Sequence, residues 1–214
     1  MRTPTAILLL LLPLFAQAQQ YAFGVYLDDK RIGTHRFTVQ RDTQDDTVRV
    51  TSLAEFNVRV LLVPVFRYRH SAFEVWRDGC LESIDTRTQV NGQHTELRGT
   101  RGSDGFTVDV HSSDGSRQQL LPECTASYAY WDAATLRRHA ELLNSQTGAY
   151  QTVNRQLVDA PDRSMLELIG PDFEIDVSYD NGDGRWLSLH TMTEDGRALE
   201  YRPENGANEP ATPL

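Results

Sequence analysis

The sequence is poor in basic residues, and lysine is nearly absent from it. It contains 21 Lys and Arg against 30 Asp and Glu, which gives a formal net charge of -9, and Lys30 is the single lysine. A chain of this charge repels a phosphate backbone, and no run of arginines makes a local basic stripe. The composition therefore excludes a nucleic-acid-binding protein of the basic type.

Sequence motifs with a defined catalytic mechanism are also missing. The chain has no Gly-x-Ser-x-Gly, His-Glu-x-x-His, Gly-rich phosphate loop or Ser-x-x-Lys. We therefore expect no cofactor, and an enzyme is disfavoured, although a dispersed Ser-His-Asp triad leaves no trace in spacing. The run Asp-Asn-Gly-Asp-Gly at 180–184 resembles a calcium loop but lacks the later glutamate, so we interpret it as a hairpin turn.

Glycine and proline, at 14 and 9 residues, are too few for a low-complexity chain, and 39% hydrophobic residues suffice for a packed core. A length of 214 residues predicts one domain. We find no internal repeat and no linker that would divide the chain.

The N-terminus is typical of a secretory signal peptide. Arg2, the apolar run at 6–12 and the small-residue triplet at 16–18 predict a signal over residues 1–18 with cleavage after Ala18. The run is shorter than the ~20 apolar residues of a transmembrane helix, and no later segment is long enough. We predict a soluble exported protein, periplasmic if the source is a Gram-negative bacterium.

The two cysteines, Cys80 and Cys124, form an even pair in a chain that is predicted to be exported. An oxidising compartment makes such a pair a candidate disulfide. The alternative is two buried, unpaired thiols. A redox site is disfavoured because the chain has no Cys-x-x-Cys spacing.

A long amphipathic strand is predicted over residues 47–61. One parity is mostly apolar: Val48, Val50, Ala54, Phe56, Val58 and Val60. The other parity is mostly polar: Arg49, Thr51, Glu55, Asn57 and Arg59. This alternation gives one buried and one wet face. The length of the strand favours a strongly coiled sheet, because the chain offers little helix to cover a flat one.

Asp-Gly and Asn-Gly pairs recur along the chain and supply the positive φ angles of tight hairpins. They begin at Asp78, Asn91, Asp104, Asp114, Asp183 and Asp195. Between them we predict strands near 21–27, 31–41, 47–61, 66–77, 80–90, 93–101, 105–111, 117–121, 149–158, 164–170, 172–180, 185–193 and 197–202. The predicted fold is all-β, a single domain over 19–202 made of a strongly curved antiparallel meander, a barrel or half-barrel.

One insertion interrupts the meander at residues 127–148. Asp132 is expected to start a helical turn within it. The segment can be a lid that presents Tyr128, Tyr130 and Trp131 to a ligand, or a plug packed on the sheet, and both have the same composition. Asn144 is expected to line this loop or to cap a turn. The tail at 203–214 is predicted to be disordered.

Two histidines share apolar strand faces. Parity places His70 with Tyr68 and Trp76, and places His35 with its own apolar neighbours. Each can be a ligand-binding group, an acid or base, or a core histidine; for His70 the core interpretation pairs it with Tyr68, Glu74 or a backbone carbonyl. Metal binding is not expected, since nothing fixes a third ligand.

The alternation from Phe66 to His70 places two arginines, Arg67 and Arg69, opposite the aromatic residues. A strand with the arginines in water and Phe66 and Tyr68 facing inward explains this pattern without a partner. If the arginines instead flank a cavity mouth, they can meet an anionic head group, because guanidinium pairs bidentately with phosphate or carboxylate.

Several short motifs resemble an uncharacterised bacterial family of signal-peptide-bearing proteins, known as a domain of unknown function. They are the runs 33–37 (GTHRF), 68–70 (YRH) with Trp76, 79–81 (GCL), 129–131 (AYW), 143–148 (LNSQTG) and 183–187 (DGRWL). The resemblance implies an exported β-rich domain with no established activity or catalytic residue. More loosely, the architecture is similar to periplasmic lipid-binding barrels and lipoprotein-carrier half-barrels.

Three functions remain open at this stage. The first is binding or carriage of an apolar, lipid-like ligand under the inserted segment. The second is a hydrolase, or an accessory to a lipid- or polysaccharide-modifying enzyme, with His35, Tyr68 and His70 as acid or base. The third is an envelope scaffold, whose protein partner the sequence does not identify. The candidate ligand-binding residues are His35, Tyr68, His70, Trp76, Tyr130, Trp131 and Asn144.

Overall fold

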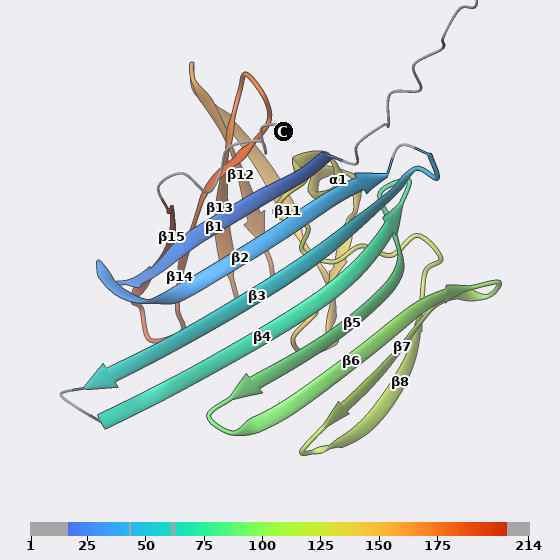
Figure 1. Cartoon of the computed structure of the whole chain (residues 1–214), viewed down its shortest axis with the longest axis horizontal. Helices are drawn as coiled ribbons and strands as arrows, with labels where there is room; N and C mark the ends of the chain where they lie inside the picture. Colours follow the sequence, from blue (N-terminus) through green and yellow to red (C-terminus); the bar gives the residue numbers. More distant parts are fainter. Residues whose placement is uncertain (1–16, 43, 61–62, 205–214) are drawn as a thin grey trace, which may run out of the picture.

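The computed structural model describes residues 17–42, 44–60 and 63–204, and one antiparallel sheet dominates them (Figure 1). Thirteen strands of the described chain form this sheet, in the order β11-β12-β13-β14-β15-β1-β2-β3-β4-β5-β6-β7-β8. They are β1 (Gln17–Leu27), β2 (Lys30–Asp42), β3 (Thr47–Val60), β4 (Val63–Arg77), β5 (Cys80–Val90), β6 (Gln93–Gly102), β7 (Gly105–Ser112), β8 (Gly115–Leu121), β11 (Asn154–Asp159), β12 (Arg163–Ile169), β13 (Glu174–Asp180), β14 (Trp186–Met192) and β15 (Ala198–Pro203).

The topology is a meander in which β1 and β15, the first and last described strands, are neighbours. β1 pairs with β2 on one side and with β15 on the other, so that Val25 faces Gly33 and Tyr201 in register. Within the described chain, β8 and β11 have one partner strand each. The sheet therefore curves strongly without closing, which confirms the predicted all-β meander and answers the question of closure.

Strand parity determines which side chains enter the core. On β3, Val50, Ala54 and Phe56 are buried, whereas Thr51 and Glu55 on the opposite face are exposed. The period-two pattern thus specifies the face that each residue occupies, because a shift of one residue would turn the whole apolar set toward water.

Residues 122–153, which we call the plug segment, connect β8 to β11 across the concave side of the sheet (Figure 1). The segment contains α1 (Ala133–Arg138) and the two-stranded ribbon of β9 (Glu141–Leu143) and β10 (Tyr150–Thr152). As expected, Asp132 caps the helix: its carboxylate accepts a hydrogen bond from the backbone N–H of Ala134 at 3.0 Å.

The plug segment is bonded to both halves of the sheet. The Thr86 hydroxyl of β5 donates to the carbonyl of Ser145 at 2.6 Å, and the Tyr179 hydroxyl of β13 donates to the carbonyl of Tyr130 at 2.9 Å. Trp131 is buried within the segment. Of the two interpretations left open by composition, this burial favours a plug over a mobile lid.

The sequence prediction was wrong within the plug segment. The strand predicted over 149–158 is two strands, β10 and β11, which belong to different sheets, and β9 was not predicted. The change occurs at Val153, which is buried and donates its backbone N–H to Ala140 at 2.9 Å. The apolar residues on either side of Val153 are too sparse to show a strand period, so they do not reveal this change of partner.

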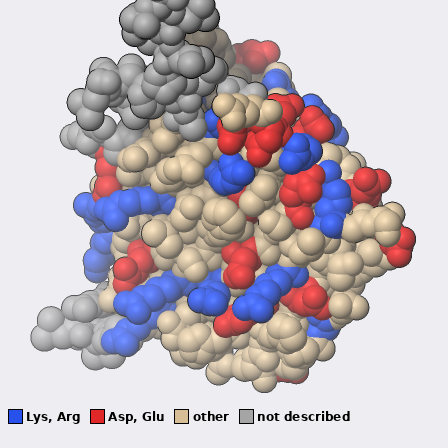
Figure 2. Space-filling view, turned by 45° about the vertical axis from the view of Figure 1, so that its right-hand side comes forward, with Lys and Arg blue, Asp and Glu red and all other residues tan. Residues whose placement is uncertain are grey.

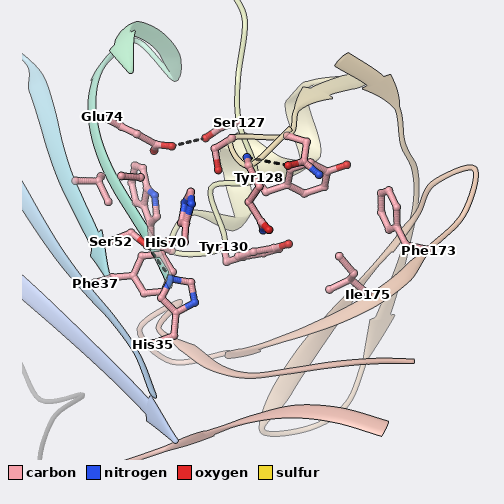
Figure 3. A pocket seen from close by; sticks show the side chains of 16 residues that line it. His35, Phe37, Ser52, His70, Glu74, Ser127, Tyr128, Tyr130, Phe173 and Ile175 are labelled. Carbon is pink, nitrogen blue, oxygen red and sulfur yellow. Dashed lines mark hydrogen bonds between the residues drawn. The ribbon is translucent and has the colours of Figure 1, made fainter. Parts of the chain in front are cut away.

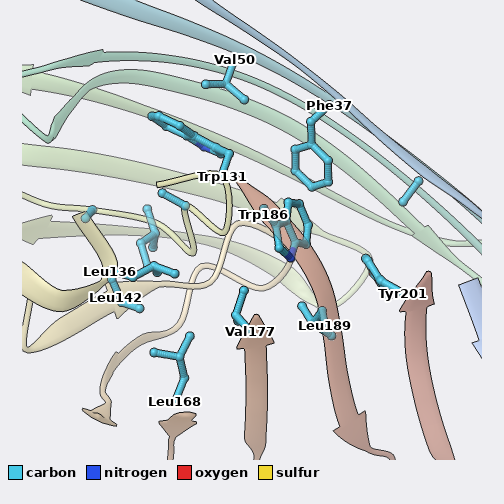
Figure 4. Close-up of a cluster of buried hydrophobic side chains, with 14 of the residues drawn as sticks. Phe37, Val50, Trp131, Leu136, Leu142, Leu168, Val177, Trp186, Leu189 and Tyr201 are labelled. Carbon is cyan, nitrogen blue, oxygen red and sulfur yellow. The ribbon is translucent and has the colours of Figure 1, made fainter. Parts of the chain in front are cut away.

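The core lies between the concave face and the plug segment, and Trp186 is at its centre (Figure 4). The Trp186 ring contacts Phe23 of β1 and Phe37 of β2, with centroids 4.3 and 5.1 Å apart. It also contacts Tyr130 of the plug segment at 5.6 Å and Tyr201 of β15 at 6.3 Å. One fully buried side chain thus joins strands from both ends of the chain to the plug.

A disulfide joins Cys80 to Cys124, as the even cysteine pair predicts. Cys80 begins β5, and Cys124 lies at the start of the plug segment. The backbone N–H of Leu81 donates to the carbonyl of Thr125 at 2.8 Å beside it. The start of the plug is therefore fixed to the sheet both covalently and by a hydrogen bond.

The face in Figure 2 carries charged side chains of both signs. Cross-strand ion pairs of the outer surface include Arg69 with Glu55 at 2.9 Å and Arg98 with Asp85 at 3.4 Å. These groups are exposed, so each pair contributes little to stability. Arg67 and Arg69 point to water while Phe66 and Tyr68 are turned inward, as their alternation predicts.

The predicted ends of the domain differ slightly from the structure. The predicted signal peptide, residues 1–18, falls outside the described residues except for its last two, and β1 begins at Gln17. β15 reaches Pro203, which faces Phe23, so the domain extends past the expected boundary at 202. Glu204 is also described and forms an ion pair with Arg31, and residues 205–214 lie outside the described residues. Within the described chain, no helix has the length and apolarity of a bilayer-spanning segment.

Candidate functional site

A pocket of about 270 Å³ opens between the concave face and the plug segment (Figure 3). Strands β2, β3 and β4 form one wall, and the plug segment with the start of β13 forms the other. The lining residues are His35, Phe37, Val50, Ser52, His70, Ala72, Glu74, Ser127, Tyr128, Tyr130, Trp131, Asn144, Ser145, Gln146, Phe173 and Ile175. This volume is slightly below the ~300–1,000 Å³ of typical ligand sites.

Five of the seven candidate ligand-binding residues meet at this pocket: His35, His70, Tyr130, Trp131 and Asn144. The sheet register explains why the two histidines converge. His35 on β2 faces Ala54 on β3, which faces His70 on β4, so both rings project from one cross-strand row.

The other two candidates lie outside the pocket lining. Tyr68 is on the same face of β4 as His70, two residues nearer the start of the strand. Its ring stacks on Phe56 with centroids 4.9 Å apart. Trp76 is fully buried and donates its indole N–H to Glu74 at 2.9 Å. Tyr68 packs beside the site, and Trp76 supports a residue that lines it.

His35 is held by two hydroxyl groups. Its Nε2 lies 2.7 Å from the Ser52 hydroxyl, and its Nδ1 lies 3.2 Å from the Tyr201 hydroxyl. Burial, with a smaller contribution from the nearby His70, lowers the pKa of His35 to about 3. The imidazole is therefore neutral at physiological pH.

His70 is also neutral, because burial lowers its pKa to about 4. Its Nδ1 lies 2.9 Å from the Thr88 hydroxyl. The expected partners, Tyr68, Glu74 or a backbone carbonyl, were wrong. Thr88 faces His70 directly on β5, whereas the other two side chains lie further along the same strand.

Glu74 is a buried carboxyl group at the edge of the pocket. It accepts hydrogen bonds from the Ser127 hydroxyl and from the Trp76 indole, each at 2.9 Å. Burial raises the pKa of Glu74, and these two hydrogen bonds oppose that rise. The Ser127 bond also ties the plug segment to β4.

Two hydrogen-bond donors of the pocket have no partner. Among the described residues, the Tyr128 hydroxyl and the Trp131 indole N–H are buried and unpaired. Both side chains line the pocket. Buried polar groups are nearly always satisfied in native proteins, so two unpaired donors on side chains that line one pocket are unusual.

Asn144 has a structural role at the pocket rim. Its side-chain oxygen accepts from the backbone N–H groups of Gln146 at 2.9 Å and Thr147 at 3.3 Å. This is a local turn of the kind that asparagine favours. The prediction that Asn144 caps a turn or lines the loop is thus confirmed in both respects.

The pocket carries no fixed positive charge: no Lys or Arg is among the residues that line it. Its two histidines are neutral, and burial disfavours the ionised form of Glu74. Apolar walls from Phe37, Val50 and Ile175 surround these groups. The arrangement fits an uncharged, largely apolar molecule that carries a hydrogen-bond acceptor.

The described residues hold one cluster with the spacing of metal ligands: Cys80, Cys124 and His139. The two sulfur atoms form the disulfide, so they cannot act as thiolate ligands in this state. His139 lies 2.9 Å from the Gly79 carbonyl through its Nε2. The cluster therefore has a structural explanation.

Sequence reasoning missed several residues of the site. Ser52 shares the inward parity of its strand and was detectable as a polar residue on an apolar face, whereas Glu74 was named only as a possible partner of His70. Phe173 and Ile175 come from the distant C-terminal half of the chain. No local pattern indicates that these residues would face β2 to β4, because that depends on how the sheet curves.

Comparison with known proteins gives a family and a fold. A family model described as a domain of unknown function, DUF6134, matches residues 23–204. The crystal structure of a beta-barrel-like protein of domain of unknown function DUF1849 from Brucella abortus is similar, with a TM-score of 0.54 and 10% identity over 88% of this chain and 96% of that chain. At this identity the likeness shows the fold alone. No curated protein matches the chain.

Proposed function

The chain belongs to the DUF6134 family of unknown function, whose model spans residues 23–204. Family membership therefore assigns no activity, and we propose from the pocket itself that the protein binds an uncharged, lipid-like molecule there. The observation that carries this proposal is the pair of unpaired donors, Tyr128 and Trp131, in a pocket with apolar walls and neutral histidines. The volume suits one small amphiphile or one end of a larger lipid.

We place this binding in the cell envelope, in an exported protein. The N-terminal sequence has the pattern of a signal peptide, and a disulfide such as Cys80–Cys124 persists in an oxidising compartment. Intact-mass analysis of the protein from an osmotic-shock fraction tests this: the expected mass begins at Gln19, and a full-length chain retained in the cytoplasm would contradict export.

Filling the pocket is expected to abolish binding. Ala72 is buried, lines the pocket and leaves room beside its small side chain, so Ala72→Phe should weaken uptake of the neutral fluorescent probe N-phenyl-1-naphthylamine at least ten-fold. Ser71→Phe is the matched control, because it puts the same ring on the opposite face of β4. Equal affinities of the two variants would refute the proposed site.

Removing one unpaired donor separates binding from stability. An unsatisfied buried hydroxyl costs ~1–3 kcal/mol, so Tyr128→Phe should leave the free energy of unfolding unchanged or raise it by about 1 kcal/mol. The same change should weaken an acceptor-bearing ligand several-fold, which lipid extraction and native mass spectrometry of the purified protein measure. A destabilised variant would show instead that the hydroxyl is bonded in the empty protein.

One contact favours a second candidate, a hydrolase. The Ser52 hydroxyl and His35 Nε2 are 2.7 Å apart, which is the distance of a nucleophile and its base, and the Tyr201 hydroxyl is on the other ring nitrogen. The pKa of about 3 makes His35 a weak base, which is why we rank this second. Labelling of Ser52 by a fluorophosphonate, abolished by Ser52→Ala, would reverse the ranking.

A further inference from the structure

The disulfide of Cys80 and Cys124 is one of two states that these residues can take. A newly synthesised chain carries both cysteines as thiols, and a dithiol reductant returns a disulfide to that state. Cys124 is exposed, so the bond is within reach of such a reductant, whereas Cys80 is buried. The reduced state therefore offers two sulfur ligands that the oxidised state does not.

A histidine lies beside the two sulfur atoms. Among the described residues, one ring nitrogen of His139 and the sulfur atoms of Cys80 and Cys124 lie within 4.8 Å of one another. Three donor atoms that bind one metal ion at ~2.0–2.3 Å are ~3.5–4 Å apart. The three side chains therefore have nearly the spacing of a metal site, and small shifts on reduction would complete it.

Three separate elements hold these ligands in place. Cys80 begins β5, Cys124 lies at the start of the plug segment, and His139 directly follows α1. The backbone N–H of Leu81 donates to the carbonyl of Thr125 at 2.8 Å, and this hydrogen bond does not depend on the disulfide. We therefore expect the two thiols to stay adjacent after reduction.

The ring of His139 is oriented by a backbone carbonyl. Its Nε2 lies 2.9 Å from the carbonyl oxygen of Gly79. A carbonyl only accepts hydrogen bonds, so Nε2 carries the proton and Nδ1 keeps the lone pair that can bind a metal. Histidines that bind metals nearly always donate their other N–H to a carbonyl, a carboxylate or water. The His139 ring therefore already has the hydrogen bond of a metal ligand.

Gly79 allows the end of α1 to approach the turn between β4 and β5. Its φ is +74°, and an added Cβ would lie 2.7 Å from Nη1 of Arg138. The same Nη1 donates to the carbonyl of Asp78 at 2.8 Å. These contacts fix the residue before His139 against the turn that leads into Cys80.

The donor set selects a soft metal ion. Two thiolates and an imidazole favour Cu(I) or Zn²⁺, whereas hard cations require oxygen ligands, and no carboxylate joins this cluster in the described part of the chain. Structural zinc sites have four protein ligands, but this cluster has three. Cu(I) with two thiolates has a net charge of -1, which the arginines of the last turn of α1, Arg137 and Arg138, complement.

We propose that the reduced pair, Cys80 and Cys124, binds one Cu(I) ion together with His139. A dithiol gives two electrons and two protons to the disulfide, which yields two cysteine thiols and the disulfide of the donor. Cu(I) then displaces the two thiol protons and forms two Cu–S bonds and one bond to Nδ1. The disulfide and the metal exclude each other, because disulfide sulfurs are not thiolate ligands.

The bound ion would replace the disulfide as a cross-link of the fold. It would connect the start of β5, the start of the plug segment and the end of α1 in the reduced protein. None of its three ligands is among the residues that line the pocket. The metal site is therefore separate from the proposed lipid site, and each can be tested without the other.

Competition for copper tests the proposal. The mature protein, reduced with a phosphine and desalted without oxygen, should remove one equivalent of Cu(I) from its coloured bicinchoninate complex. The oxidised protein should remove none, and this comparison needs no mutation. Cys80→Ala with Cys124→Ala should abolish uptake.

The contribution of His139 is measured with the reduced protein. His139→Gln should weaken the affinity for Cu(I) by at least the ~10-fold that loss of an outer partner costs at a metal site. His111→Gln is the matched control, because His111 is exposed on β7, and it should bind like the wild type. Equal affinities of the wild type and His139→Gln would overturn the proposal.

Two measurements on the wild type keep the proposal testable if His139→Gln does not fold. Cu(I) should protect both cysteines of the reduced protein from iodoacetamide, and it should raise the melting temperature of the reduced protein, since it binds the folded state. Cysteines that react freely in the presence of Cu(I), uptake by the oxidised protein, or binding of Zn²⁺ in preference to Cu(I) would each overturn the proposal.

Discussion

Acidification from pH 7 to pH 4.5 is expected to lower the free energy of unfolding by about 2 to 5 kcal/mol. His35 and His70 have folded pKa values of about 3 and 4, below the ~6.5 of an unfolded histidine. Between the folded and the unfolded pKa values the unfolded chain binds more protons than the folded chain. The free energy of unfolding therefore decreases as the pH decreases, by ~1.4 kcal/mol per pH unit for each histidine. Their stabilising effect is complete above pH 6.5.

Glu74 opposes this trend over part of the range. Burial raises its folded pKa, so the folded state retains a proton that the unfolded carboxyl releases above its ordinary pKa. The contribution of Glu74 to the free energy of unfolding is therefore largest in acid, and it declines as the pH rises by at most ~1.4 kcal/mol per pH unit. Two histidines against one carboxyl leave a net loss on acidification.

Urea unfolding at pH 7, 5.5 and 4.5 measures this loss. The double variant His35→Gln and His70→Gln should be less stable at pH 7 but should lose little more on acidification. His111→Gln is the control, because His111 is exposed on β7. If the double variant kept the wild-type pH dependence, the two histidines would not be the groups that titrate.

Removal of the disulfide is the second change with a large expected effect. Cys80→Ala with Cys124→Ala should lower the free energy of unfolding by about 4 kcal/mol, because the bridge closes a loop with a sequence separation of 44 residues. The physical cause is a larger conformational entropy of the unfolded chain.

The loss should appear without reductant and disappear with it. Thermal unfolding of the wild type and the double variant, each with and without dithiothreitol, gives the comparison. In reductant the two proteins should melt within a few degrees of each other. An undiminished difference in reductant would mean that the cysteines stabilise the fold by packing.

Much of the sheet was predictable because its strands are long and alternate in polarity. The faces of β2, β3 and β4, and hence the convergence of His35 and His70 on one side, follow from parity and register. The hairpin turns follow from Asp-Gly and Asn-Gly pairs, and the disulfide from the even cysteine count. All of these are local patterns or simple pairings.

The remainder of the site depends on long-range geometry that no local pattern contains. The sheet curves until the start of β13 comes opposite β4, and this brings Phe173 and Ile175 to the pocket. The hydrogen-bond partner of His70 is Thr88, which lies beside it on the neighbouring strand β5 and not near it in the sequence. The chain changes its partner strands at Val153, where the apolar residues are too sparse to form a pattern that marks the change.

The neighbouring positions of β1 and β15 bear on how this protein assembles. Strands β1 to β8 form from successive hairpins, and β11 to β15 do the same, so each half of the sheet can assemble from contacts close in sequence. The pairing of Val25 with Tyr201 joins the halves and closes nearly the whole chain into a loop. Such a non-local contact is slow to form. We therefore expect two quickly formed half-sheets and a slow final step, in which β15 pairs with β1.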